Sequence, residues 1–131
     1  GVSFKVTECM TKLDAARGLV YMAAKQADLN PNSSETRRLV SEAKLFATQV
    51  SWEVVNDAMQ ILGGIGYTYV YPIEKALRDA RLGLIWTGSN EVMKMLIQHE
   101  AYRRLLTGGD RDRDLELDAT EAHKTAEKVF E

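Results

Sequence analysis

The chain has 131 residues, of which 45% are hydrophobic and 27% are charged, and its formal net charge is −2. This is the composition of one ordinary globular domain, and no apolar run reaches the roughly 18 residues that a membrane-spanning helix needs. The basic residues are scattered along the sequence, so the clustered positive charge of a nucleic-acid-binding protein is missing.

Charge divides the chain into two parts. Residues 1–106 carry 13 Lys and Arg against 11 Asp and Glu, whereas residues 107–131 carry 4 against 8. We therefore expect a helical body over 1–106 and a loosely ordered acidic tail over 107–131, which has enough apolar residues for a short helix at most. The single cysteine, Cys9, has no partner for an internal disulfide, and we expect a cytoplasmic location.

Helical periodicity begins at about Ser3. Apolar residues recur there at intervals of three and four up to Leu29, which is the spacing of an amphipathic helix. A turn follows, in which Ser33 or Ser34 can accept a hydrogen bond from a free amide of the next helix. That second helix is predicted over about 35–62.

The second helix carries apolar residues on more than one side. Phe46 and Trp52 lie nearly opposite each other on a helical projection. A helix with one solvent-exposed face does not place two large aromatic residues on opposite sides. We expect this helix at the centre of a bundle or against another subunit.

Two shorter helices complete the predicted body. Gly63 and Gly64 end the second helix, and Pro72 fits the first turn of a third. The buried face of the third helix is predicted to hold Ile73, Ala76, Leu77 and Ala80. Ser89 or Asn90 caps a fourth helix that runs to about Leu106. Its inward residues are predicted to be Val92, Met95, Leu96 and Tyr102. These elements predict an all-α fold, an antiparallel up-and-down four-helix bundle.

Two glycine-rich turns are the candidate ligand sites. Gly63, Gly64 and Gly66 follow a helix, and such a density of glycine indicates a sharp change of direction or a close backbone approach to a ligand. No strand precedes them, which excludes a dinucleotide fingerprint of the Rossmann kind. The second turn, residues 88–91, lies at the start of a helix, where free amides and the positive end of the dipole suit an anion. The alternative is a plain helix cap with its loop, and the residues taken alone favour this alternative.

No metal-binding pattern accompanies these turns. His99 and His123 are far apart in the sequence, and neither has a second ligand at a metal-binding spacing. We therefore expect no metal site.

Four ordered motifs resemble the C-terminal helical domain of acyl-CoA dehydrogenases, in register from about Phe4 to Leu106. They are Gln60-x-x-Gly63-Gly64-x-Gly66-Tyr67, Tyr71-Pro72-Ile73-Glu74-Lys75, Arg78-Asp79-Ala80 and Ile85-Trp86-Thr87-Gly88-Ser89-Asn90-Glu91.

The resemblance implies a flavoenzyme of fatty acid metabolism that binds FAD between subunits of a homo-oligomer, a dimer or a tetramer. It implies an acyl-CoA thioester as substrate and an acceptor like the electron-transfer flavoprotein. Within the family, the segment that matches Gln60, Gly63 and Gly64 approaches the pyrophosphate of FAD held mainly by a neighbouring subunit. These three residues are therefore expected to bind the cofactor.

The second turn is expected to contact FAD and substrate. By the same resemblance, Ser89 and Glu91 touch the adenosine part of FAD, and Gly88 lines the acyl-CoA side. In many members the residue before this glycine is the glutamate that removes the α-proton. Here it is Thr87, whose hydroxyl is too weak a base, so no catalytic residue is assigned.

The resemblance also leaves parts of the family's machinery outside the chain. The N-terminal and β portions are absent, and Gly1 falls about where the second helix of the family's C-terminal domain begins. We expect the C-terminal part of an acyl-CoA dehydrogenase that is inactive alone. The alternative is a helical assembly module derived from the family, which has no catalytic role.

Overall fold

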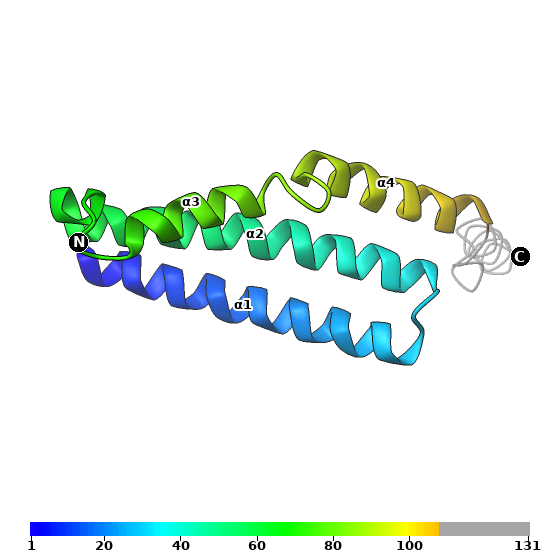
Figure 1. Cartoon of the computed structure of the whole chain (residues 1–131). Coiled ribbons are helices and arrows are strands. Elements are labelled where there is room, and N and C mark those ends of the chain that lie inside the picture. The colour runs from blue at the N-terminus through cyan, green and yellow to red at the C-terminus, as the bar shows by residue number, and fades with distance from the viewer. Residues whose placement is uncertain (108–131) are drawn as a thin grey trace, which may run out of the picture. The chain divides into compact units, whose positions relative to one another are not determined.

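The computed structural model describes residues 1–107, and the predicted acidic tail from residue 108 onward lies outside the described residues. The described elements are α1 (Val2–Leu29), α2 (Ser34–Leu62), the 3₁₀ helix η1 (Gly63–Tyr67), α3 (Ile73–Gly83) and α4 (Asn90–Thr107) (Figure 1). The all-α class is confirmed. None of the helices over residues 1–107 is long and apolar enough to cross a membrane.

Helix α2 is the central element of the compact unit formed by residues 1–100. It contacts α1 along its length and also contacts η1 and α3. Figure 1 shows α1 running antiparallel to α2, with α3 on another side of α2 and α4 following in the direction of α3. The prediction that α2 is covered on more than one side is therefore confirmed.

Small residues let α1 and α2 approach closely. Ala23 of α1 meets Leu39 and Ala43 of α2 in a buried cluster, with Leu19 packed against it. Alanine has little surface to bury, so this contact contributes only modest hydrophobic stabilisation.

Ion pairs tie α1 to the second half of α2. Lys5 Nζ lies 2.6 Å from Asp57 Oδ1, and Lys12 Nζ lies 2.7 Å from Glu53 Oε2. The hydrogen bond from Lys12 lowers the pKa of Glu53 below its ordinary value, and the same bond raises the pKa of Lys12. The pairs link the two helices at two positions along their length.

The start of α2 is capped by Ser33, one of the two predicted serines. Its Oγ accepts a hydrogen bond from the Thr36 backbone N–H at 3.0 Å. The Thr36 hydroxyl in turn donates to the Asn30 carbonyl at 2.6 Å, which fastens the turn to the end of α1. Ser33 therefore begins the helix and fixes the turn before it.

The predicted buried face of α3 is confirmed, because Ala80 is buried and the other three predicted residues are half-buried. The predicted inward face of α4 is wrong. The four residues expected there are 42–68% exposed: Val92, Met95, Leu96 and Tyr102. The buried positions of α4 are instead Asn90, Met93 and Glu100.

Polar contacts explain the orientation of α4. Asn90 and Glu100 both bond to side chains of α2, and these bonds turn their face of α4 toward α2. The apolar residues of α4 are left on the outside. Because no large side chain of the described residues is fully buried, residues 1–107 leave extensive apolar surface uncovered.

Candidate functional site

The end of α2 depends on Gly63. Its backbone adopts φ 65° and ψ −150°, a conformation open essentially to glycine alone. Its N–H donates to the carbonyls of Met59 and Gln60, so this N–H is already hydrogen-bonded within the chain. Gly63 therefore produces the sharp turn that the sequence predicted.

The other two glycines of this turn differ in what surrounds them. Gly66 is buried, and a Cβ there would lie 2.9 Å from Leu62 Cβ and 3.1 Å from the Met59 carbonyl oxygen. Packing therefore requires glycine at position 66. At Gly64, by contrast, nothing lies within 4 Å of an added Cβ, and its φ is not positive. Neither a positive φ nor internal packing requires glycine at position 64.

A pocket lies at this turn. Its volume is about 320 Å³, and its lining residues are Asn56, Met59, Gln60, Gly63, Gly64 and Tyr67. All three cofactor-binding residues predicted for the turn thus line one pocket. Asn56 and Tyr67 also line this pocket, although neither was assigned to a site from the sequence. Asn56 lies four residues before Gln60, so helical spacing was the signal that could have found it.

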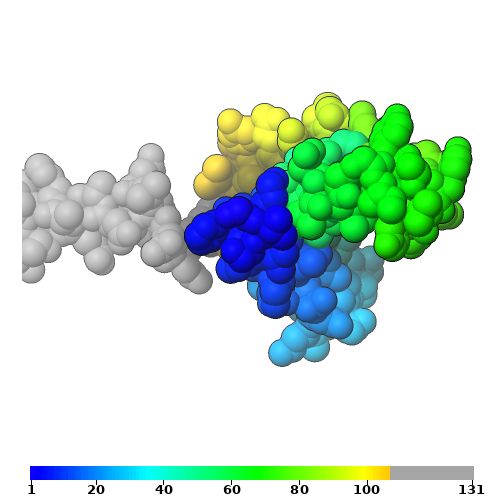
Figure 2. Space-filling model, turned by 90° about the vertical axis from the view of Figure 1, so that its left-hand side faces the viewer, coloured from blue at the N-terminus to red at the C-terminus, as the bar shows by residue number. Residues whose placement is uncertain are grey.

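Tyr67 stands out from the surface beside the pocket, with 81% of its side chain exposed. Figure 2 shows the green segment that includes η1 on the face of the molecule where α1 begins, in dark blue. The Lys5–Asp57 ion pair joins the start of α1 to α2 in the same region. The pocket is therefore open to solvent, close to the ion pair that joins α1 and α2.

The second turn contains two residues with positive φ. Thr87 has φ 50° and Gly88 has φ 91°. A β-branched residue with positive φ is a genuine outlier, and such backbone strain is found most often at functional sites. A Cβ at Gly88 would lie 2.6 Å from Met93 Cε, so glycine is required there for packing as well.

Lys44 of α2 binds this turn through hydrogen bonds. Its Nζ donates to the Gly88 carbonyl and to Asn90 Oδ1, both at 2.8 Å, and the Thr48 hydroxyl donates to the same Asn90 oxygen at 3.1 Å. Asn90 Nδ2 is buried and has no hydrogen-bond partner among the described residues. Nothing in the sequence indicated this network, because Lys44 lies more than 40 residues before the turn.

Ser89 and Glu91 lie at the N-terminus of α4, as predicted. The Ser89 carbonyl accepts from the Met93 N–H at 3.0 Å. Hydrogen bonds from its own backbone N–H and from the Ser89 side chain lower the pKa of Glu91. The Ser89 Oγ accepts from the Val92 N–H at 3.5 Å, which caps the helix, and Glu91 places a negative charge at the positive end of the helix.

The two turns lie at opposite ends of α3. The 11 residues of this helix separate them by about 16 Å along its axis. The pocket at the first turn contains none of Gly88, Ser89 and Glu91. The described structure therefore presents two separate groups of predicted site residues, which only an extended ligand can reach together.

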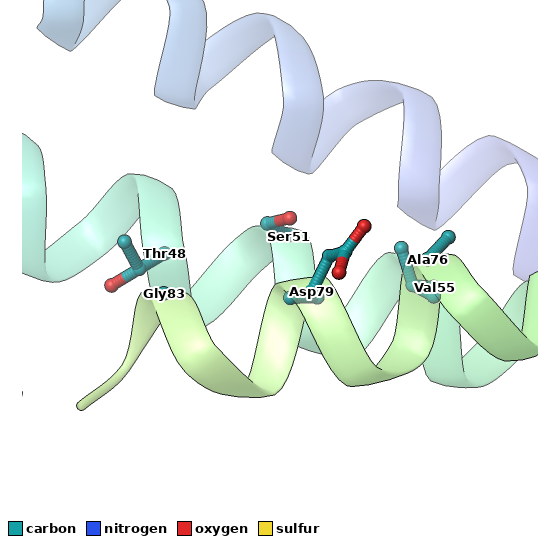
Figure 3. Close-up of a pocket in the computed structure, with 7 residues that line it drawn as sticks. Thr48, Ser51, Val55, Ala76, Asp79 and Gly83 are labelled. Atoms are coloured by element: carbon teal, nitrogen blue, oxygen red, sulfur yellow. The ribbon is translucent and has the colours of Figure 1, made fainter. Parts of the chain in front are cut away.

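A groove of about 390 Å³ lies between α2 and α3, lined by Thr48, Ser51, Val55, Ala76, Asp79, Ala80 and Gly83. Figure 3 shows Ser51 and Asp79 projecting to the same side of it, from α2 and α3 respectively. Asp79 is paired with Lys75. The groove contains no residue predicted for a site, and its small side chains are typical of close helix packing.

Within residues 1–107 no group of three or more His, Cys, Asp or Glu side chains is placed to hold a metal ion. His123 lies outside the described residues. The two turns are thus the candidate functional sites of the described part of the chain.

The family "Acyl-CoA dehydrogenase, C-terminal domain" matches residues 1–102. The chain belongs to the acyl-CoA dehydrogenase family and carries its C-terminal domain.

Curated relatives share about two fifths of their aligned residues with the chain. It is 41% identical over 97 residues to an acyl-CoA dehydrogenase of Bacillus subtilis, covering 74% of the chain and 25% of that protein. It is 38% identical over 95 residues to cyclohexane-1-carbonyl-CoA dehydrogenase of Geobacter metallireducens, covering 72% of the chain and 24% of that protein. The chain thus spans about a quarter of the length of these relatives.

Two solved structures are also similar to this chain. The acyl-CoA dehydrogenase of Slackia heliotrinireducens matches with a TM-score of 0.71 and 31% identity, over 80% of this chain and 27% of that one. A chain from a structural study of the electron transferring flavoprotein of Acidaminococcus fermentans matches with a TM-score of 0.67 and 38% identity, over 79% of this chain and 25% of that one.

Proposed function

We propose that this chain is the C-terminal part of an FAD-dependent acyl-CoA dehydrogenase and forms one side of an FAD site between subunits. The pocket at the end of α2 carries the proposal. Gln60, Gly63 and Gly64 line it together, and the space over Gly64 is open to an approaching group. Ser89 and Glu91 complete the set of cofactor-binding residues at the other turn.

The residues of this chain fit such a role in binding. The first turn offers an open glycine backbone and the carboxamide of Gln60, and the second offers a rigid backbone held by Lys44. Gly88 lies at the tip of that second turn, where we place the acyl-CoA thioester. Bound FAD would supply the acceptor for the hydride that leaves the β-carbon of the acyl group. The residues of this chain would orient the cofactor and shield it from water.

The proton chemistry lies outside this chain in our proposal. Removal of the α-proton needs a carboxylate, and Thr87 cannot provide one. In some members of the family the glutamate lies on an earlier helix of the same domain, and we assign the base to such a segment. In a protein in which the missing dehydrogenase portion is joined to this chain, Thr87→Ala should therefore leave thioester oxidation largely intact. A loss as large as that from removing a catalytic carboxylate would contradict this assignment.

The exposed apolar surface supports association with other parts of the dehydrogenase or with further copies of it. Phe46 on α2 is 41% exposed and Met95 on α4 is 68% exposed. Surface of this kind is typical of an interface, and we propose a homo-oligomer, a dimer or a tetramer. Light scattering should show association at high concentration, and a strict monomer would contradict it. An acceptor like the electron-transfer flavoprotein and a cytoplasmic location belong to the same proposal.

The second candidate is a helical module that only assembles with itself or a partner. The exposed apolar surface favours it as much as it favours the enzyme, whereas the open space over Gly64 favours the enzyme. The gene sequence upstream of the codon for Gly1 separates the two. An in-frame dehydrogenase portion, whose product oxidises an acyl-CoA thioester, supports the enzyme. A stop codon there supports the module.

A further inference from the structure

The turn between α3 and α4 is strained, but its most strained residue has no bonds of its own. Thr87 and Gly88 are consecutive residues with positive φ, 50° and 91°. Backbone strain of this kind persists only where the surrounding contacts enforce it. Thr87 is exposed and forms no hydrogen bond with any of residues 1–107, through its backbone or its hydroxyl. The contacts that enforce its conformation therefore act on its neighbours in the chain.

Lys44 supplies those contacts. Its ammonium group donates to the Gly88 carbonyl and to Asn90 Oδ1, both at 2.8 Å, so it binds the turn on either side of Ser89. Hydrogen bonds from a charged donor are roughly twice as strong as those between neutral groups. Lys44 pairs with no carboxylate in the described part of the chain. Its ammonium group therefore binds two neutral oxygens that both belong to this turn.

The side chain of Asn90 is oriented by Lys44. Asn90 is only 6% exposed, and its Nδ2 has no acceptor among the residues that the structure describes. Rotating the carboxamide by half a turn would place this donor against the Lys44 ammonium group, which can only donate. A buried donor without an acceptor is costly, so the contact with Lys44 outweighs that cost. The Asn90 N–H also donates to the Leu84 carbonyl at 3.0 Å, which closes the turn.

We propose that Lys44 is a positioning residue for thioester oxidation. By binding the Gly88 carbonyl and Asn90, it keeps the backbone at Thr87 in the strained conformation in which this turn meets the acyl-CoA thioester. The inference rests on the proposed function, which places the thioester at Gly88. A misplacement of about 1 Å in a positioning element can slow a reaction about 100-fold, so Lys44 can set the rate without contacting the substrate.

Nuclear magnetic resonance on the 131-residue chain tests, independently of enzymatic activity, whether Lys44 holds the turn. A strong nuclear Overhauser effect between the amide and Hα protons of Thr87 marks its positive φ. We expect this signal to be lost in Lys44→Met, which keeps a long unbranched side chain but removes the donors. Lys12→Met is the matched control and should keep the signal, because Lys12 also bonds across two helices but makes no bond to the turn.

Kinetics test the role in the reaction, in a protein in which the missing dehydrogenase portion is joined to this chain. Lys44→Met should lower kcat, expressed per bound FAD, by about 10- to 100-fold and leave KM within about twofold. Adding Thr87→Gly should restore a large part of the lost kcat, because glycine adopts a positive φ without a restraint. Lys12→Met should change neither constant. A lysine that only stabilised the fold would leave kcat per bound FAD unchanged.

If Lys44→Met does not fold, Lys44→Arg replaces it. The planar guanidinium cannot place its donors where the ammonium group does, so kcat should fall about threefold or more at unchanged KM, and full kcat would overturn the inference.

The other outcomes separate the inference from the proposed function. A folded Lys44→Met chain that keeps the Thr87 signal would overturn the inference and leave the proposed function standing. The inference also fails if the signal is lost while kcat is unchanged, or if Thr87→Gly restores none of the lost kcat. An unsubstituted joined protein that oxidises no acyl-CoA thioester would instead contradict the proposed function, and with it any role of Lys44 in the reaction.

Discussion

Arg37 on α2 and Glu100 on α4 form an ion pair in which the carboxylate is almost fully buried. Arg37 Nε donates to Glu100 Oε1 at 2.8 Å, and the Glu100 side chain is only 7% exposed. The Ser34 hydroxyl donates to the other carboxylate oxygen at 2.6 Å. The hydrogen bond to Glu100 raises the pKa of Arg37. The carboxylate also lies at the N-terminus of α2, where the helix dipole favours a negative charge.

Replacing Glu100 should loosen α4 from α2. Glu100→Gln keeps the size of the side chain but removes the charge, so the free energy of unfolding should fall by about 1.5–3 kcal/mol, the range for a hydrogen bond to a charged group. Urea unfolding followed by circular dichroism measures this. Asp14→Asn is the matched control, because Asp14 pairs with Arg17 on an exposed part of α1 and its loss should leave the midpoint unchanged. Equal effects of the two changes would contradict the account.

The Lys12–Glu53 pair predicts a pH dependence of stability. The folded-state pKa of Glu53 is lowered from 4.5, so its contribution is present above that value and is lost as pH falls through the folded pKa. The pKa of Lys12 is raised from 10.5, so its contribution persists below that value and is lost as pH rises beyond the folded pKa. Unfolding at pH 6 and pH 3 should therefore show a smaller acid loss in Glu53→Gln than in the unsubstituted chain. An identical loss in both proteins would show that the pair contributes nothing.

Substitution of two neighbouring glycines should separate packing from ligand binding. Gly66→Ala forces its Cβ against Leu62 and the Met59 carbonyl, and we expect destabilisation of about 1–3 kcal/mol. Gly64→Ala meets nothing within 4 Å and should leave the thermal midpoint nearly unchanged. In the flavin-binding protein, however, Gly64→Ala should release FAD. A Gly64→Ala protein with normal flavin affinity would remove the argument for close approach at this position.

The backbone strain at Thr87 predicts a substitution that stabilises the fold. Thr87→Gly removes the side chain from a residue with φ 50° and should stabilise the fold by about 1 kcal/mol, after the entropy cost of glycine. Gly88→Ala should destabilise it, because φ is 91° and Met93 Cε blocks the new Cβ. Differential scanning calorimetry compares the two. A destabilised Thr87→Gly protein would show that Thr87 makes contacts that outweigh its strain.

The helices could be predicted from sequence because their signals are local. Three- and four-residue spacing, the cap at Ser33 and the stop at Gly63 each depend on a few adjacent residues. The three predicted residues at the first turn were found together in one pocket for the same reason.

The orientation of α4 could not be predicted, because it depends on partners far away in the sequence. Asn90 is bonded to Lys44 and Glu100 to Arg37, and each pair is separated by more than 40 residues. Apolar spacing alone placed the wrong face of α4 inward. The positive φ of Thr87 was equally hidden, since the sequence offers glycine at the next position for that conformation.

The central claim is that this chain supplies one side of a flavin site, and flavin content tests it most directly. The chain would replace the matching quarter of the Bacillus subtilis acyl-CoA dehydrogenase, to which it is 41% identical over 97 residues. We predict a yellow protein with one FAD per subunit, and a loss of that FAD in the Gly64→Ala form of the same chimera. A folded, colourless chimera, or one whose flavin is indifferent to Gly64→Ala, would contradict the claim.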